Sequence, residues 1–143
     1  MDETGEHVIA RGQSQIAASE IVGNEIIWGT FGPYGAEGGV YRAALDGSNP
    51  TKLWDGAVTE LLVDASDVYA AGDEGVAWID LQSRRTTVLA KSSSPRGLML
   101  HRERVFWVNE SESSRAAEPT GSVQSVPRHG GAITTHIDLL PWP

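Results

Sequence analysis

Acidic side chains in short polar segments are the residues of this 143-residue chain that come closest to a chemical site. Six of them fall in or beside three such segments: Glu37, Asp73, Glu74, Glu110, Glu112 and Glu118. Carboxylate oxygens suit hard cations, so acidic loops that meet on one face could attract Ca²⁺ or a cationic ligand. The six residues lack the spacing of an EF-hand or repeat-toxin loop, which favours solvated side chains over a metal site. The sequence therefore predicts no cofactor and no metal ligand, with Ca²⁺ as the one ion to consider.

Two aromatic residues join this acidic set as candidates for contact with a partner. Tyr34 stands in the loop sequence Gly-Pro-Tyr-Gly, where an exposed aromatic ring can anchor an interface. Trp54 lies where a predicted strand runs into its next connection. The candidate binding residues are Tyr34, Trp54, Asp73, Glu74 and Glu110.

Catalytic motifs are absent from the sequence. There is no Gly-x-Ser-x-Gly elbow, no phosphate-binding loop and no His-Glu-x-x-His, and the chain has no cysteine. The histidines are His7, His101, His129 and His136, and no two have the helical spacing of zinc ligands. His101 and His129 fall in expected turns, where solvated side chains are the simpler interpretation. No catalytic residue is predicted.

The elements that must position these residues follow from a twelve-residue block that occurs three times, at residues 17–28, 59–70 and 96–107. Each copy has an apolar run, a polar turn and a second apolar run. The ends of the copies, Trp28, Ala70 and Trp107, are 42 and then 37 residues apart. A period of roughly 40–50 residues with four strands is typical of a propeller blade. Trp28 and Trp107 are expected to pack between such blades.

Alternating apolar and polar residues, bounded by turn formers, predict the strands. They are expected at residues 15–22, 25–30, 39–45 and 51–54, then 59–63, 67–71, 75–81 and 86–90, and finally 97–101, 105–109, 122–127 and 134–138. The predicted fold class is all-β: one domain over residues 1–143, with three blades of four antiparallel strands at about 15–56, 57–92 and 94–140. Residues 7–12 resemble residues 87–91, so an additional outer strand is expected there.

Length variation is concentrated in the connection between the second and third strand of each blade, here called the B–C loop. Val40 to Ala70 spans 30 residues and Val76 to Trp107 spans 31, whereas the B–C connections differ by up to ten residues. All B–C loops of a propeller emerge on one face, and length changes confined to one face are typical of a binding face. Low-cost tolerance of loop length explains the same pattern. Both interpretations stay open.

Composition narrows the possible partners. The formal net charge of −8 and the lack of a Lys/Arg cluster argue against nucleic acid. No stretch reaches the ~20 apolar residues that span a bilayer. The first residues are acidic and polar, unlike a secretory signal. The compartment is therefore periplasmic or extracellular if a targeting segment was removed, and cytoplasmic otherwise.

Several segments taken in order resemble a known group of propellers. They are Leu45-Asp46-Gly47, Leu61-Leu62-Val63-Asp64, Asp67-Val68-Tyr69, Val105-Phe106-Trp107, and Gly121-Ser122-Val123-Gln124-Ser125-Val126-Pro127 with Gly130-Gly131. This pattern resembles the six- or seven-bladed β-propellers of the YWTD, NHL and TolB-like group, including their bacterial members. The resemblance implies a ring of about six blades, which three blades cannot close. Propeller lactonases of this kind use a Glu, Asn and Asp set that has no match here.

The function predicted from the sequence is a non-enzymatic binding module that uses its B–C loop face for a protein, peptide or glycan. The alternative is a metal-dependent propeller hydrolase or lactonase. The terminal blades would expose large apolar faces, so we expect a homo-oligomer, or completion by further blades of a longer propeller.

Overall fold

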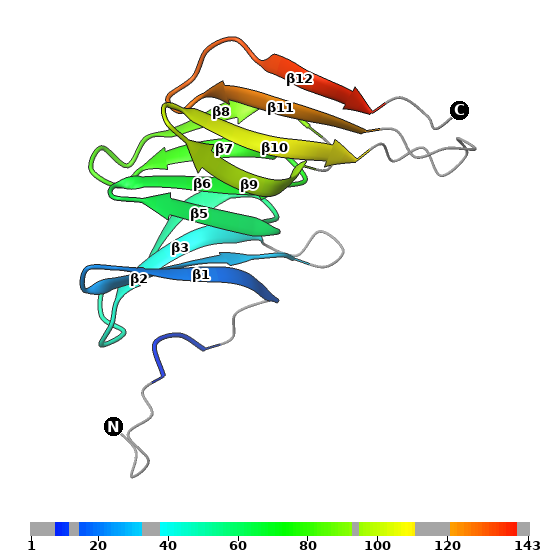
Figure 1. The fold of residues 1–143 in the computed structure, drawn as a ribbon. Coiled ribbons are helices and arrows are strands. Elements are labelled where there is room, and N and C mark those ends of the chain that lie inside the picture. Colours follow the sequence, from blue (N-terminus) through cyan, green and yellow to red (C-terminus); the bar gives the residue numbers. More distant parts are fainter. Residues whose placement is uncertain (1–7, 12–14, 33–37, 93–94, 111–120, 140–143) are drawn as a thin grey trace.

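The computed structural model describes residues 8–11, 15–32, 38–92, 95–110 and 121–139. Within these ranges the chain forms twelve strands and no helix. The strands make three four-stranded antiparallel sheets, stacked face to face in chain order (Figure 1). We call these sheets blades 1, 2 and 3. The all-β fold of four-stranded blades in an unclosed array is confirmed.

Strand order follows chain order in every blade. Blade 1 contains β1 (Ile16–Val22), β2 (Glu25–Thr30), β3 (Gly39–Ala44) and β4 (Thr51–Asp55). Blade 2 contains β5 (Glu60–Asp64), β6 (Asp67–Gly72), β7 (Gly75–Asp80) and β8 (Thr86–Ala90). Blade 3 contains β9 (Pro95–His101), β10 (Arg104–Glu110), β11 (Gly121–Pro127) and β12 (Thr134–Leu139). Each strand begins and ends within two residues of its predicted position.

A tight two-residue turn joins the first two strands of each blade. Its first residue has a positive φ in all three blades: Gly23 at 59°, Ala65 at 54° and Arg102 at 54°. Hairpin turns of two residues need this backbone conformation, because it matches the twist of the flanking strands. Only blade 1 supplies glycine, the residue that adopts it without strain.

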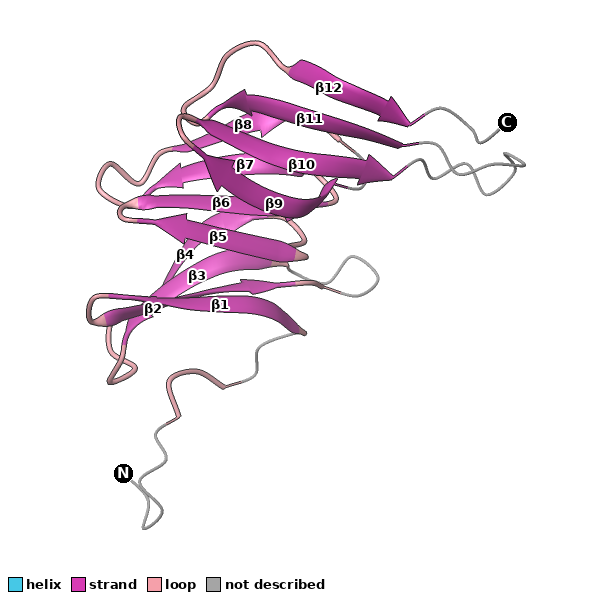
Figure 2. Ribbon diagram, viewed as in Figure 1, coloured by secondary structure: helices cyan, strands magenta, loops and turns pink. Residues whose placement is uncertain are grey.

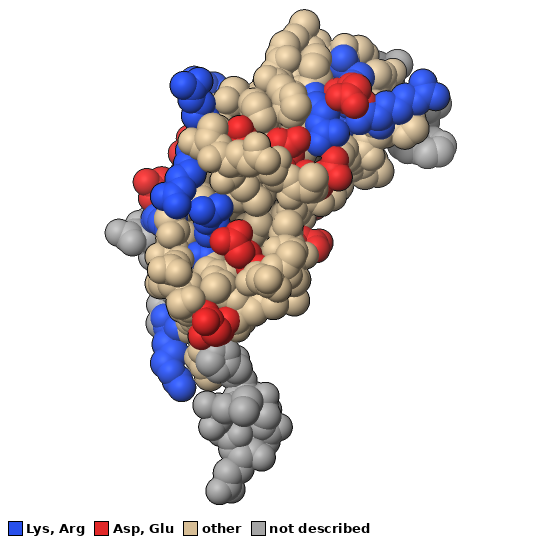
Figure 3. Space-filling view, turned by 90° about the vertical axis from the view of Figure 1, so that its left-hand side faces the viewer, with Lys and Arg blue, Asp and Glu red and all other residues tan. Residues whose placement is uncertain are grey.

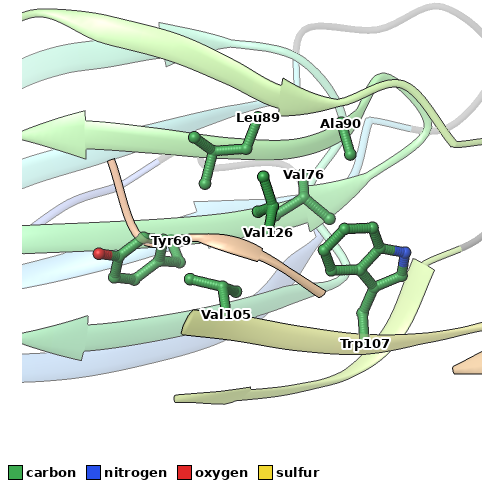
Figure 4. Packing of buried hydrophobic residues seen from close by; sticks show 7 residues of the cluster. All are labelled: Tyr69, Val76, Leu89, Ala90, Val105, Trp107 and Val126. Atoms are coloured by element: carbon green, nitrogen blue, oxygen red, sulfur yellow. The ribbon is translucent and has the colours of Figure 1, made fainter. Parts of the chain in front are cut away.

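Two apolar cores hold the blades together. Ile27, Val40, Val58, Val68 and Ile79 pack between blades 1 and 2. A second cluster, shown in Figure 4, packs between blades 2 and 3 and contains Tyr69, Val76, Leu89, Ala90, Val105, Trp107 and Val126. Successive residues of a strand point to opposite faces of its sheet, so blade 2 contributes alternate residues of β5, β6 and β7 to the two cores.

Two sequence predictions differ from the structure. Trp107 packs between blades as expected, but Trp28 lies on the face of blade 1 that points away from blade 2, stacked on Tyr41 with ring centroids 5.6 Å apart. The additional strand expected over residues 7–12 is not a strand in its described part, residues 8–11. An outer strand needs a neighbouring strand to complete its backbone hydrogen bonds, and the sequence match to residues 87–91 does not supply one.

Candidate functional site

The connection between blades 1 and 2, residues 56–59, lies at the same end of the stack as the hairpin between β6 and β7, on the right in Figure 2. The Val58 amide donates to the Thr30 carbonyl (3.0 Å), and the Thr59 amide donates to the Ala71 carbonyl (2.8 Å). The connection between blades 1 and 2 is thereby hydrogen-bonded to both flanking hairpins. We call this end of the molecule the B–C end.

Glycine permits the close approach of these segments. A β-carbon at Gly72 would overlap the carbonyl oxygen of Ala57, and one at Gly75 would overlap that of Ala90. Gly75 also has a φ of 112°, a backbone conformation that residues other than glycine rarely adopt. The hairpin between β6 and β7 is therefore fixed tightly against the connections on both sides of blade 2.

An open hollow of about 470 Å³ lies beside this hairpin. It is lined by Asp73, Glu74, Val88, Lys91 and Ser92. Asp73 and Glu74 form the turn between β6 and β7 and are exposed, while Val88 leaves 48% of its surface in solvent. The hollow thus offers two carboxylates, an ammonium group, a hydroxyl group and an apolar wall. Such a mixture suits a peptide with both a cationic and an apolar side chain.

A polar cluster anchors one side of the hollow to blade 3. Asn109 accepts hydrogen bonds from the Ser92 hydroxyl and from the indole nitrogen of Trp107, the latter at 3.0 Å. Its amide nitrogen donates to Gln124. Ser92 is therefore held in place by the second strand of blade 3. Sequence analysis missed Asn109, since the contact joins residues that are 17 positions apart in the chain.

The predicted binding residues do not all gather at the hollow. Asp73 and Glu74 line it together. Trp54 lies within β4, half-buried, and packs against the core between blades 1 and 2. Tyr34 lies outside the described residues. Glu110 is the last residue of β10, and the structure describes its backbone but not its side chain.

Within the described ranges, no three His, Asp or Glu side chains are close enough together to hold a metal ion. Ca²⁺ binding by the acidic loops and the alternative metal-dependent hydrolase stay predictions. The same part of the chain contains no helix with the length and apolar character needed to cross a membrane.

A second cluster of polar side chains lies at the opposite end, between blades 2 and 3. Arg128 follows β11 and places one guanidinium nitrogen 2.8 Å from both Asp64 and Asp67. His129 lies 3.1 Å from Asp67, and its ring is 4.3 Å from that of Trp78. The Trp78 indole also donates to Asp67, at 2.8 Å. Figure 3 faces this end and shows side chains of both charges exposed on it.

These contacts shift the pKa values of the groups involved. Burial alone would raise the pKa of Asp67, but hydrogen bonds from His129, Trp78 and Arg128 outweigh it and lower the pKa. The hydrogen bond to Asp64 is the largest of the effects that raise the pKa of Arg128. Both residues are therefore charged at neutral pH, which suits an ion pair that joins two blades. His129 was expected to be a solvated turn residue, and nothing in its turn sequence indicates that Asp67 lies opposite.

Comparisons with known proteins identify the fold but not a family. No family model and no curated protein matches the sequence. Among solved structures, a chain in the crystal structure of a nidogen/laminin complex aligns with a TM-score of 0.63 and 15% identity. An acylaminoacyl peptidase from Pyrococcus horikoshii aligns with a TM-score of 0.65 and 8% identity. The fold is a β-propeller left open after three blades.

The propeller neighbours are longer than this chain. The alignments cover 86% and 87% of this chain, but only 48% of the chain in the nidogen/laminin complex and 25% of the peptidase. The chain therefore spans about half and a quarter of the lengths of these two neighbours. At such low identity the likeness concerns the fold alone.

Proposed function

We propose that this chain is a non-enzymatic binding module that captures a protein or peptide partner at its B–C end. The observation that carries the proposal is the hollow beside the hairpin of Asp73 and Glu74. It combines exposed charges with apolar surface beside the B–C hairpin of blade 2. The presence of one fold neighbour in a protein complex supports a protein partner over a glycan.

The proposal includes assembly with further blades. Both outer faces of the stack expose large apolar side chains, among them Ile21 at 63% and Met99 at 54%. Sheet faces of this kind are stable in water when another layer covers them. The additional blades come either from a second copy or from a longer chain.

The binding site is tested with a library of short displayed peptides selected on the wild-type protein. Affinities of the selected peptides are then measured by calorimetry for Glu74→Gln and for Glu103→Gln. Glu103 is the matched control, because it is also an exposed Glu in a two-residue hairpin turn but lies at the opposite end. Loss of one charge-assisted hydrogen bond should weaken binding roughly tenfold in Glu74→Gln only, with an unchanged melting temperature.

Two outcomes contradict the proposal. In one, no peptide is enriched above the background of the library. In the other, the selected peptides bind both variants as tightly as they bind the wild type.

A further inference from the structure

The two outer faces of the blade stack can be compared residue by residue with the interfaces inside it. We call the face of blade 1 that points away from blade 2 the first face, and the face of blade 3 that points away from blade 2 the last face. The second strands β2, β6 and β10 all start directly after the two-residue turn. Counting from these starts gives each residue its counterpart in the other blades.

The apolar centre of the interface between blades 2 and 3 has counterparts on both outer faces. There Tyr69, the third residue of β6, packs with Val105 and Trp107, the second and fourth residues of β10. On the last face, the third residue of β10 is Phe106. On the first face, the second and fourth residues of β2 are Ile26 and Trp28. Phe106 on the last face is therefore the counterpart of Tyr69. The apolar pair on the first face is the counterpart of the two β10 residues that Tyr69 contacts.

Exposed apolar residues around this centre follow the same correspondence. On the last face, Met99 pairs with Phe106 just as Leu62 pairs with Tyr69. Ile137 pairs with Val123 as Ala90 pairs with Val76. Leu62 and Ala90 pack in the core between blades 2 and 3, but Met99 and Ile137 are 54% and 53% exposed.

The first face shows the same exposure. Ile21 pairs with Ile26 as Leu100 pairs with Val105. Leu100 packs against the core between blades 2 and 3, whereas Ile21 is 63% exposed. Exposed side chains on both outer faces thus stand where the internal interface has packed ones.

Two charged residues at the rims of the outer faces are complementary to each other. Between blades 2 and 3, Asp67 begins β6 and contacts His129, the second residue after β11. On the last face, the residue that begins β10 is Arg104. On the first face, the second residue after β3 is Asp46. A blade 3 docked on a blade 1 in the same geometry would place Arg104 beside Asp46, as an opposite-charge pair at the position of the Asp67–His129 contact.

Residues 8–11 now cover part of the first face. A hollow of about 310 Å³ separates residues 8–10 from Ile16, Ser19, Ile26 and Trp28. This segment is not a strand, and Val8 is 51% exposed. A sheet that packs on the first face would fill the hollow and bury more apolar surface than this segment does.

We propose that the last face of one copy packs on the first face of a second copy of this chain, with residues 8–11 displaced. Phe106 then lies on Ile26 and Trp28, and Arg104 lies beside Asp46. The same contact made twice closes the two copies into a ring, which is how a head-to-tail interface gives a finite assembly. The ring of two copies is one form of the assembly included in the proposed function. Its surfaces are separate from the B–C end, so loss of the double mass and loss of peptide binding are distinguishable failures.

The test is the mass in solution, measured by light scattering. Wild type is expected at twice the 15.3 kDa of one chain. Arg104→Glu and Asp46→Arg should each weaken association at least about tenfold, because each places like charges opposite one another. An equimolar mixture of the two variants should regain the double mass, since both contacts of the mixed ring then pair opposite charges. Arg85→Glu, an exposed residue of the middle blade, is the matched control and should behave as wild type.

Circular dichroism establishes that each variant is folded. Truncation of residues 1–11 should strengthen association, because it removes the segment that the second copy displaces. The proposal is overturned if wild type has the mass of one chain, if the mixture fails to regain the double mass, if the truncated chain loses association, or if larger assemblies grow with concentration.

Discussion

The interface between blades 1 and 2 and the interface between blades 2 and 3 join sheets with the same strand order but differ in chemistry. The first is apolar and very close: a β-carbon at Gly29 would overlap the side chain of Val58. Among the described residues, two side chains donate hydrogen bonds to backbone carbonyls across it: Arg42 to Leu81 at 3.3 Å and Thr86 to Leu53 at 3.5 Å. Arg42 also lies 4.0 Å from Glu25 of its own blade.

The second interface adds a polar network to its apolar core. Beyond the contacts of Arg128, the carboxylate of Glu60 accepts hydrogen bonds from the amides of Gly97 and Leu98, both at 2.8 Å. Apolar contact fixes distance but little else, whereas hydrogen-bonded charges also fix orientation. The comparison indicates that the first interface relies on close packing and the second on packing plus directed polar contacts.

The largest effect is expected from Trp107→Ala. The indole is fully buried in the second interface and donates a hydrogen bond to Asn109, so its removal leaves a cavity and takes away one of the two donors to the Asn109 side-chain oxygen. We expect a loss of about 3–5 kcal/mol in the free energy of unfolding, measured by denaturant titration. Ile27→Ala is the matched change in the first interface and should cost about 2–4 kcal/mol. A larger loss for Ile27→Ala would reverse the ranking of the two interfaces.

Arg128→Met is expected to have the next largest effect. It keeps a long apolar side chain but leaves Asp67, whose side chain is only 14% exposed, without one of its hydrogen-bond donors. The free energy of unfolding should fall by about 1–3 kcal/mol. Arg42→Met is the control at the first interface and should cost less than about 1 kcal/mol. Equal losses in both variants would mean that the polar network contributes nothing particular to the second interface.

A change of pH should separate the interfaces further. The lowered pKa of Asp67 means that the unfolded chain binds a proton more readily than the folded chain does. Its contribution to stability is therefore complete above the ordinary carboxyl value of 3.8, and is lost as the pH falls through the lower folded value.

Asp67→Asn should have a smaller decrease in stability than wild type below about pH 4. Asp80 also has a lowered pKa, chiefly because of a hydrogen bond from Ser83, and this hydrogen bond is present in both proteins. The measurement is the difference between the two stability curves, and parallel curves would contradict the prediction.

Glu25→Gln should have the smallest effect. Glu25 is 43% exposed, and its contact with Arg42 is at the limit of an ion pair. We expect a change within about 0.5 kcal/mol, detectable only by denaturant titration in replicate. A loss above about 1 kcal/mol would show that the first interface also depends on charge.

Local patterns in the sequence predicted the blades well, because strand alternation and turn residues are read from neighbouring positions. Both β2 and β8 have the predicted bounds exactly as written. The direction of Trp28 was wrong, since alternation shows which residues share a face but not which face meets the next blade. The contact of His129 with Asp67 depends on two turns that are 62 residues apart, and no local pattern reports it.

Of the predicted binding residues, Asp73 and Glu74 are adjacent in sequence, so their meeting at the hollow needed only the correct hairpin. Trp54 is different because a tryptophan at a strand end can face solvent or the core. Here it packs against the core between blades 1 and 2.

The chain-order pairing of strands has a consequence for how the protein folds. Each hairpin closes between strands that follow one another in sequence, so a blade can form before its neighbours do. Pairing in chain order keeps short the loops that must close within a blade, so little loop entropy is lost when its hairpins form. Within a single chain, blade 2 alone is covered on both faces by the other described blades. In the Arg104→Glu variant, whose association is weakened, the amides of blade 2 should therefore exchange with solvent most slowly, and hydrogen exchange should decrease from the two outer blades towards the middle one.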